Sequence, residues 1–355
     1  MQTIQATNYS VFFNETGYKK LASYLIPENY SKIFILVDEN TSQYCLPNFL
    51  NNLAIEIEIE IIELEVGEIH KNIATCTEVW TALSDLGADR KSVLINLGGG
   101  VISDLGGFVA CTFKRGIDFI NIPTTLLSMV DASIGGKNGV DLGSLKNQIG
   151  IIREPKAVIV DTHFLSTLPQ NEMRSGLAEM LKHGLIFDKM YWDTFKKLKD
   201  LHTEDLNQLI HQSIQIKNSI VCEDLTENGI RKALNFGHTL GHAIESYFLE
   251  NDSKTSLLHG EAIAVGMILE SFISKEKGLL TTDEYQEIKY IINDIFERVT
   301  FDQNDIEKII ELLIFDKKNE FGKVQFALLD GIGKIKINQE SDNKLIYKAF
   351  EDYSV

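Results

Sequence analysis

Histidine and glutamate side chains at helical spacings are the first candidates for chemistry in this sequence. His238 and His242 are four residues apart, so both imidazoles would lie on one face of a helix. The zinc-protease motif requires glutamate directly after the first histidine, and Thr239 stands there, which excludes that class. His259 and Glu179 add further donors. Two histidines and one glutamate would hold a metal ion and leave one coordination position open.

Two neighbouring residues leave the choice of ligands open. Lys182 lies one helical turn after Glu179, and His183 lies four residues after Glu179. His183 therefore competes with the other histidines on spacing alone. Each histidine taken singly is also consistent with an ordinary polar residue on a helix face.

A glycine-rich turn at residues 98–100 is the second candidate. It follows an apolar run and precedes an expected helix. Glycines let the backbone approach a pyrophosphate, and a helix N-terminus offers free N–H groups and positive potential. The dinucleotide-binding pattern is incomplete, because Ser103 occupies the third glycine position. A tight strand–helix turn without a ligand is the alternative.

The third candidate is a pair of lysines, Lys137 and Lys146, in a stretch that also holds Gly135, Gly136 and Asn147. In a chain with few basic residues, such a stretch indicates a pocket for an anion. Ordinary solvated lysines on a loop are the alternative.

The elements that position these groups follow from the hydrophobic pattern. Short apolar runs predict strands buried on both faces, at residues 33–37, 92–96, 119–122 and 157–160. Residues 55–66 alternate between apolar and acidic side chains and predict a strand near a sheet edge. A helix is expected over residues 72–86. This order predicts an α/β domain with a Rossmann-like, doubly wound parallel sheet.

The pattern becomes helical after Pro169, and no proline follows it. Helices are expected over residues 172–186, 191–201, 204–223, 230–248 and 261–277. A terminal hairpin is expected from residues 325–329 and 335–337. We therefore expect two domains, an α/β domain over residues 1–165 and a mainly α-helical domain over residues 166–355.

Length and composition agree with this division. The 355 residues exceed the ~150 residues of a typical domain, and the net charge of −17 disfavours binding to a nucleic acid backbone. The four cysteines show no CxxC spacing and are expected as free thiols in the cytoplasm. We expect neither a secretory signal nor a membrane span.

Taken in order, motifs spread over nearly the whole chain resemble 3-dehydroquinate synthase, a sugar phosphate cyclase family of the shikimate pathway. The matching segments are residues 66–71, 98–104, 113–116, 123–128, 130–137, 146–150, 176–184, 234–245, 259–262 and 316–318. The chain departs from the family pattern at Ser103, Asn138, Asp141 and His183, and its interval from His242 to His259 is a few residues longer. None of these departures removes a residue with a catalytic role in the family.

The resemblance implies a lyase that uses NAD and a metal in the pathway to chorismate and the aromatic amino acids. It would convert 3-deoxy-D-arabino-heptulosonate 7-phosphate (DAHP) to 3-dehydroquinate and inorganic phosphate. The family oxidises a substrate hydroxyl transiently, eliminates phosphate, returns the hydride and closes the ring by an intramolecular aldol step. The implied protein is a cytoplasmic homodimer that acts on a small sugar acid phosphate.

The resemblance also implies the site residues. The metal, zinc in preference to cobalt, would be held by Glu179, His238 and His259. The implied catalytic and substrate-binding residues are Arg115, Asp131, Lys137, Lys146, Asn147, Lys182, Lys217, Arg231, Asn235, His242, Lys317 and Lys318. The implied NAD-binding residues are Asp38, Asn40, Gly67, Glu68, Lys71, Gly99, Gly100, Val101, Ser103, Asp104, Thr124, Thr125, Lys137, Lys146, Phe164 and Thr167.

Several of these roles are specific. Lys137, Lys146, Asn147 and either Lys317 or Lys318 would bind the phosphate, with Arg115 reaching in from a neighbouring subunit. Lys217 and Arg231 would bind the substrate carboxylate. His242 would transfer a proton rather than bind the metal. Asp38, at the end of a strand, would accept a hydrogen bond from the ribose and favour NAD over NADP.

Two alternatives remain from the sequence. One is another sugar phosphate cyclase or a metal-dependent polyol dehydrogenase. The other is a binding protein that keeps the fold without catalysis. The intact set of Glu179, Lys182, His238, His242 and His259 argues against the second, since buried charges are retained where they have a role.

Overall fold

The computed structural model describes residues 1–53, 55, 57–143, 145–200, 203–251, 253–313 and 324–355. The chain divides into two compact units, Met1–Met173 and Arg174–Val355. This division lies within a helix, whereas the sequence predicted a boundary near residue 165.

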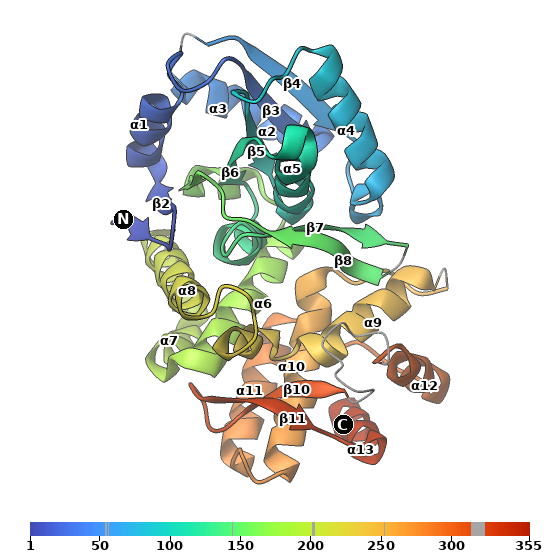
Figure 1. Cartoon of the computed structure of the whole chain (residues 1–355). Coiled ribbons are helices and arrows are strands. Elements are labelled where there is room, and N and C mark those ends of the chain that lie inside the picture. The colour runs from blue at the N-terminus through green and yellow to red at the C-terminus, as the bar shows by residue number, and fades with distance from the viewer. Residues whose placement is uncertain (54, 56, 144, 201–202, 252, 314–323) are drawn as a thin grey trace. The chain divides into compact units, whose positions relative to one another are not determined.

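The first unit is built on a seven-stranded sheet with the order β1-β2-β9-β6-β5-β3-β4 (Figure 1). Its strands are β1 (Ile4–Gln5), β2 (Ser10–Phe13), β3 (Ile33–Asp38), β4 (Ile59–Leu64), β5 (Val93–Gly98), β6 (Asp118–Pro123) and β9 (Ala157–Val160). All neighbours pair in parallel except β1, which is antiparallel to β2. The predicted Rossmann-like parallel sheet is confirmed, and the alternating strand β4 lies at its edge as predicted.

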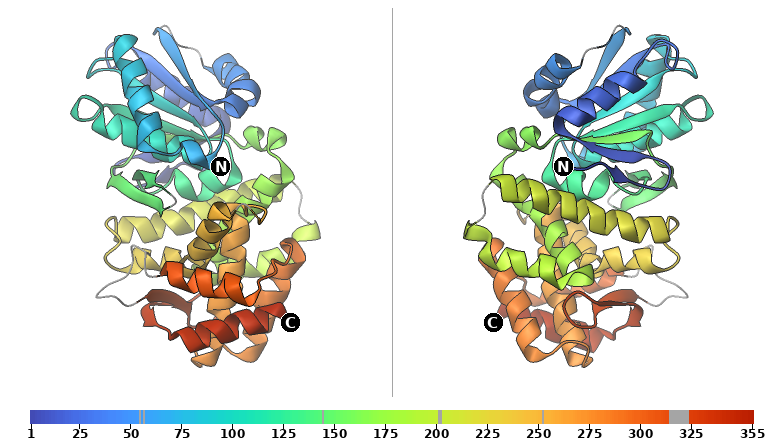
Figure 2. Two further views of the ribbon diagram at one scale, coloured as in Figure 1. Left: turned by 90° about the vertical axis from the view of Figure 1, so that its right-hand side faces the viewer. Right: turned by 90° about the vertical axis from the view of Figure 1, so that its left-hand side faces the viewer.

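Helices cover both faces of this sheet (Figure 2). They are α1 (Asn14–Tyr24), α2 (Glu39–Tyr44), α3 (Leu46–Asn52), α4 (Ile73–Asp85) and α5 (Gly100–Thr112), with short turns η1 (Glu68–His70), η2 (Phe113–Arg115), η3 (Ser128–Ala132) and η4 (Thr162–Thr167). Phe34 and Leu36 of β3 pack in one cluster with α4 and α5. Ile33, Ile35 and Val37 are also fully buried and alternate with them, so β3 is apolar on both faces.

A two-stranded hairpin, β7 (Lys137–Leu142) and β8 (Leu145–Ile152), follows the sheet strands and was not predicted from the periodicity. Two glycines face each other where its strands approach. A Cβ atom on Gly139 would lie 2.6 Å from the carbonyl oxygen of Ile149, and one on Gly150 would lie 2.6 Å from that of Asn138. Close pairing of the two strands therefore requires glycine at both positions.

The second unit is mainly helical, as predicted. Its helices are α6 (Gln170–Phe187, which begins in the first unit), α7 (Lys189–Thr194), η5 (Phe195–Asp200), α8 (Thr203–Glu223), η6 (Ile230–Asn235), α9 (His238–Glu250), α10 (His259–Glu276), α11 (Thr282–Ile295), α12 (Gln303–Leu312) and α13 (Asn343–Ser354). The strands β10 (Gln325–Leu329) and β11 (Ile335–Glu340) form the predicted antiparallel hairpin. Most residues of helix α10 are buried, and it packs against α9, α11 and α13. Among the described residues, no helix is both long and apolar enough to cross a membrane.

One predicted helix is interrupted. The periodicity predicted a single helix over residues 230–248, but the chain forms η6, breaks at Phe236 and Gly237, and then begins α9. Gly237 has a left-handed backbone with φ of +77°, which favours glycine. A Cβ atom on Gly237 would also lie 2.5 Å from Cγ of Met267. The expectation that Arg231 and His238 share one helix is therefore wrong.

Candidate functional site

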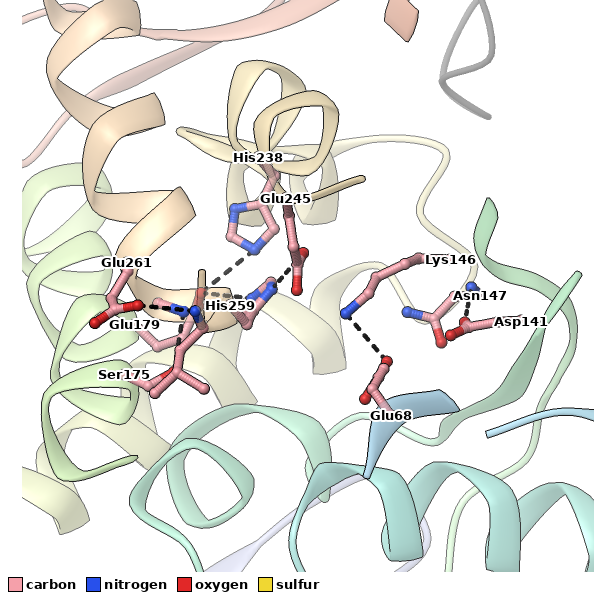
Figure 3. A network of polar contacts seen from close by, with 12 residues as sticks. Glu68, Asp141, Lys146, Asn147, Ser175, Glu179, His238, Glu245, His259 and Glu261 are labelled. Carbon is pink, nitrogen blue, oxygen red and sulfur yellow. Dashed lines mark hydrogen bonds and ion pairs between the residues drawn. The ribbon is translucent and has the colours of Figure 1, made fainter. Parts of the chain in front are cut away.

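A carboxylate and two imidazoles converge in the second unit (Figure 3). Glu179 comes from the middle of α6, His238 is the first residue of α9, and His259 is the first residue of α10. Oε1 of Glu179 lies 3.3 Å from Nε2 of His238 and 3.6 Å from Nε2 of His259. Residues from three separate helices thus meet at one point.

The Glu179 carboxylate has the environment of a cation ligand. It is completely buried, and neither of its oxygens accepts a hydrogen bond of good geometry from the described residues. Lys182, one turn later on α6, forms an ion pair with Oε2. A buried carboxylate with unused lone pairs, facing two imidazole nitrogens, is a donor set that suits a divalent ion such as Zn²⁺ or Co²⁺.

The protonation states follow from these contacts. Burial tends to raise the pKa of Glu179, but Lys182 and His238 outweigh it and hold that pKa well below its usual range. Burial, together with Lys182, lowers the pKa of His238 to about 4. Burial opposes the charge on His259, yet Glu245 and Glu179 raise its pKa to about 9. Without a metal, the site at neutral pH holds an anion, a neutral imidazole and an imidazolium.

The other nitrogen of each ligand ring is also held. Nδ1 of His238 lies 3.0 Å from the carbonyl oxygen of Phe236, and Nδ1 of His259 lies 3.2 Å from Oε2 of Glu245. Each Nδ1–H donates to an oxygen, which fixes the ring orientation and leaves Nε2 facing Glu179. The imidazoles are therefore oriented for a ligand at Nε2.

Two further histidines lie nearby. His242 is one turn after His238, and one ligand atom from each of His238, His242 and His259 lies within 4.8 Å of the others. A three-histidine set is thus a geometric alternative to the set with Glu179. His183 is fully buried, and its Nδ1 lies 2.7 Å from the hydroxyl of Ser213 on α8.

The residues expected to bind the substrate carboxylate lie on η6 and α8, which pack against each other. Arg231 is 1% exposed, and its guanidinium donates to the carbonyl oxygen of Leu225 at 2.6 Å. Lys217 is also buried. The side chain of Asn235 donates to Glu227 at 2.8 Å.

In the first unit, several of the expected cofactor residues lie at the carboxyl ends of the sheet strands. The parallel strands β4, β3, β5 and β6 are neighbours, so their carboxyl ends lie side by side. Asp38 ends β3, Gly99 and Gly100 follow β5, Thr124 follows β6 and Glu68 follows β4. The carboxyl ends of parallel strands are where α/β sheets bind ligands.

The glycine turn is closely packed at the start of α5. A Cβ atom on Gly98 would lie 2.5 Å from Cβ of Ile102, so this position requires glycine. Helix α5 begins directly afterwards, and no side chain caps its N-terminus. Its first amides, from Gly100 and Val101, therefore lack a capping side chain. By contrast, Ser103 is 1% exposed, and its hydroxyl is enclosed by the fold.

Asp38 is already engaged at the start of α2. Its Oδ1 accepts from the backbone amide of Thr41 at 2.7 Å and from the Thr41 hydroxyl at 2.9 Å. Since a carboxylate accepts several hydrogen bonds, this cap is compatible with a further donor. Asn40, on the first turn of α2, is exposed.

A chain of charges links the expected cofactor residues to the expected phosphate residues, and Figure 3 shows its contact between Glu68 and Lys146. Lys71 donates to Asp104 at 2.7 Å and lies 3.7 Å from Glu68, and Glu68 lies 3.1 Å from Lys146. Burial disfavours the charge on Lys71, but Asp104 and Glu68 raise its pKa. Lys71 is therefore an ammonium ion inside the unit.

The hairpin separates the two expected phosphate lysines. Lys137 opposes Ile152 at one end, whereas Lys146 and Asn147 lie close to the turn at the other end. Asn147 has a left-handed backbone with φ of +52°, and its amide donates to Asp141 at 2.6 Å. Asp141 thus holds the backbone of Asn147.

The remaining expected residues are dispersed over the first unit. Arg115 is exposed in η2 with φ of +70°, and Asp131 is half-buried in η3. Gly67 has φ of +124°, Thr125 hydrogen-bonds Ser128, Phe164 is buried, and the Thr167 hydroxyl donates to the carbonyl of Phe164. Lys317 and Lys318 lie outside the described residues.

Glu227 and Glu245, which contact expected site residues, were not assigned from the sequence, and neither was the buried Glu270 of α10. Glu245 lies seven residues after His238, on the same helical face, and that spacing could have identified it. Glu270 stands in the otherwise apolar run of α10, and a charge in such a run is itself a signal.

Two family models match consecutive parts of the chain. Residues 61–175 match the family model described as 3-dehydroquinate synthase N-terminal, and residues 176–319 match the one described as 3-dehydroquinate synthase C-terminal. A 3-dehydroquinate synthase from Parabacteroides distasonis is 41% identical over 338 residues, which are 94% of each chain.

Solved structures have the same fold over the full length. The structure of 2-deoxy-scyllo-inosose synthase with carbaglucose-6-phosphate, NAD⁺ and Co²⁺ is similar with a TM-score of 0.83 and 26% identity, over 99% of each chain. That of 2-epi-5-epi-valiolone synthase from Streptomyces hygroscopicus, with NAD⁺ and Zn²⁺, is similar in fold with a TM-score of 0.83 and 24% identity. The similarity covers 100% of this chain and 99% of that one.

Proposed function

Because this chain belongs to the 3-dehydroquinate synthase family, we propose that it converts DAHP to 3-dehydroquinate and inorganic phosphate. The reaction combines transient oxidation of a substrate hydroxyl, phosphate elimination, re-reduction and intramolecular aldol closure. It makes the protein a carbon–oxygen lyase that serves aromatic amino acid synthesis in the cytoplasm.

The observation that carries this proposal is the convergence of Glu179, His238 and His259. These three residues would hold a divalent ion, and the edge of the sheet around Gly99 would hold NAD. When bound, the ion supplies a Lewis acid for a substrate hydroxyl and NAD supplies a reversible hydride acceptor.

The chain's own residues would bind and orient the substrate. Lys146 and Asn147, with Lys137, would bind the phosphate, since ammonium and amide donors match its oxygens. Arg231, supported by Lys217, would bind the carboxylate through its planar guanidinium. His242, one turn from His238, would move a proton at the substrate.

We also propose a homodimer in which Arg115 enters the phosphate site of the partner subunit. Arg115 is exposed and lies in a turn with left-handed backbone, away from the core of its own unit. An exposed guanidinium at a fixed turn is suited to a contact with another chain.

The decisive experiment is to incubate the purified protein with DAHP, NAD and Zn²⁺ or Co²⁺ and to measure phosphate and 3-dehydroquinate. We expect many turnovers for each NAD, with no net accumulation of NADH. A chelator should stop phosphate release. Stoichiometric NADH would contradict the proposal and favour a polyol dehydrogenase, whereas activity on glucose 6-phosphate alone would favour another cyclase.

A further inference from the structure

Glu270 is a charged residue at a fully buried position of α10. It belongs to none of the sites described above. The residues around it in the helix, from Met267 to Ile273, are buried as well. A carboxylate in such surroundings is stabilised only if donors are directed at it.

The donors come from another helix. Oε2 of Glu270 accepts from the backbone amide of Gly237 at 2.7 Å, and Oε1 accepts from the amide of Leu240 at 3.1 Å. Gly237 is the N-cap residue of α9 and Leu240 lies in its first turn, and this helix start has no capping side chain of its own. Glu270 of α10 therefore caps the N-terminus of α9, where the positive end of the helix dipole favours an anion.

The two backbones also meet at this point. A Cβ atom on Gly266 would lie 2.0 Å from the carbonyl oxygen of Gly237 and 2.8 Å from the amide of Gly241. The start of α9 therefore rests directly on α10, with Glu270 one turn beyond Gly266. Contact and hydrogen bonds together leave this turn little freedom.

His238 lies between the two amides that Glu270 holds. Its Nδ1 is directed to the carbonyl oxygen of Phe236, and its Nε2 faces Glu179. Since His259 begins α10, the helix that carries one imidazole anchors the turn that carries the other. Any movement of this turn changes the distance between the two imidazoles.

We propose that Glu270 is a positioning residue of the metal centre, which fixes the first turn of α9 and thereby the approach of His238 to the ion. This inference rests on the proposed metal site and assigns Glu270 no contact with the ion itself. Its role is to keep the ligand atoms at one separation, which a divalent ion with a preferred geometry requires.

The test compares Glu270→Gln with Asp342→Ala in the full-length protein. The glutamine side chain would keep the shape but offer one acceptor for two amides, and it removes the charge. Asp342 caps α13 by accepting from the amide of Leu345 at 2.8 Å, and it is not a neighbour of the candidate ligands in the sequence or in their hydrogen bonds. The measurements are the Co²⁺ dissociation constant, the visible absorption spectrum of the Co²⁺ protein and the thermal midpoint of the metal-free protein.

We expect E270Q to raise the Co²⁺ dissociation constant by about 10–100-fold and to change the visible spectrum. D342A should lower the thermal midpoint and leave affinity and spectrum as in the wild type. If E270Q lowers only the thermal midpoint, Glu270 is merely a helix cap and the inference fails while the proposed function stands. If the wild type binds no Co²⁺, both the inference on Glu270 and the proposed metal-dependent function fail. Should E270Q not fold, Glu270→Asp is measured instead, with the same three measurements and the same criteria.

Discussion

The Nδ1–H group of His259 donates to Oε2 of Glu245 across 3.2 Å, between the first residue of α10 and a buried residue of α9. The opposite nitrogen of the ring faces Glu179. A carboxylate behind a ligand histidine orients the ring and increases its basicity. We therefore expect Glu245 to strengthen metal binding although it contacts Nδ1 of His259 and is not itself a proposed ligand.

We expect Glu245→Gln to weaken Zn²⁺ or Co²⁺ binding by about 10–100-fold, because the amide neither balances the charge nor orients the ring as firmly. The dissociation constant can be measured by competition with a chromophoric chelator. Glu261→Gln is the matched control, since Glu261 is two residues from His259 but accepts from the amide of Leu258 at 2.8 Å. Equal effects of the two substitutions would contradict a specific role for Glu245.

The same pair predicts a pH dependence for the metal-free protein. Burial alone would lower the pKa of His259, but Glu245 and Glu179 raise it to about 9, above the ~6.5 of an unfolded chain. A raised pKa contributes stability that is complete below pH ~6.5 and is lost as the pH rises through about 9. Urea unfolding with a chelator present should therefore show E245Q less stable than the wild type at pH 6. The gap should narrow as the pH rises through 9, and a constant gap would contradict this assignment.

Glu179→Gln and His242→Ala distinguish the two possible ligand sets, with His238→Ala and His183→Ala as controls. Glu179→Gln should remove most of the bound metal because Glu179 belongs only to the proposed set, and His238→Ala should do so with either set. His242→Ala and His183→Ala should retain metal. H242A should nevertheless lose activity, because the residue proposed to transfer a proton is gone. Metal content after dialysis, measured by atomic emission, gives the answer. If H242A loses metal and E179Q keeps it, the three-histidine set is the correct one.

The sequence predicted the sheet because its strands are apolar runs, as in β3 and β5, and because their alternation with helices admits few arrangements. It did not predict the hairpin of β7 and β8. Strand formation there depends on close pairing of the two backbones at Gly139 and Gly150. Such pairing produces no alternation of apolar and polar residues in the sequence of either strand.

The sequence predicted which residues form the site better than it predicted how they are arranged. Spacing placed His238 and His242 on one face, but nothing local joins them to Glu179 on α6, and the family resemblance supplied that link. The break at Gly237 interrupts a continuous helical pattern because α10 packs against it. Glu245 shares a helical face with His238, so its spacing was a usable signal, whereas Glu270 lies on another helix and contacts the start of α9 only in the folded chain.

Arg115 gives a test of assembly. An Arg115→Ala chain and a Lys137→Ala chain are each expected to be inactive as homodimers. If Arg115 acts in the partner's site, a heterodimer of the two has one intact site, so a 1:1 mixture should recover up to about a quarter of wild-type activity. Heterodimers can be verified by differential tags. No recovery in verified heterodimers would place Arg115 in its own subunit's site.

The last prediction concerns the choice of substrate. DAHP carries a carboxylate, and the sugar phosphates used by sister cyclases do not, so the site needs a cation for it. Arg231 is buried in η6, and one of its guanidinium nitrogens donates to the carbonyl oxygen of Leu225. The backbone amide of Arg231 donates to the carboxylate of Asp224 at 3.1 Å. This support fixes the planar donor group, which Lys cannot reproduce.

Arg231→Ala should therefore lower kcat/KM for DAHP by ~100-fold or more, and Arg231→Lys should recover only part of it, since lysine keeps the charge without the paired donors. Metal and NAD content should stay near those of the wild type. Lys232→Ala is the control, because Lys232 is the adjacent cation and reaches toward Asn338 at 3.3 Å on the surface. Normal turnover of DAHP by R231A, or equal losses in R231A and K232A, would remove Arg231 as the carboxylate ligand. The cyclase fold and the metal centre would then remain, with the carboxylate bound by Lys217 or another cation.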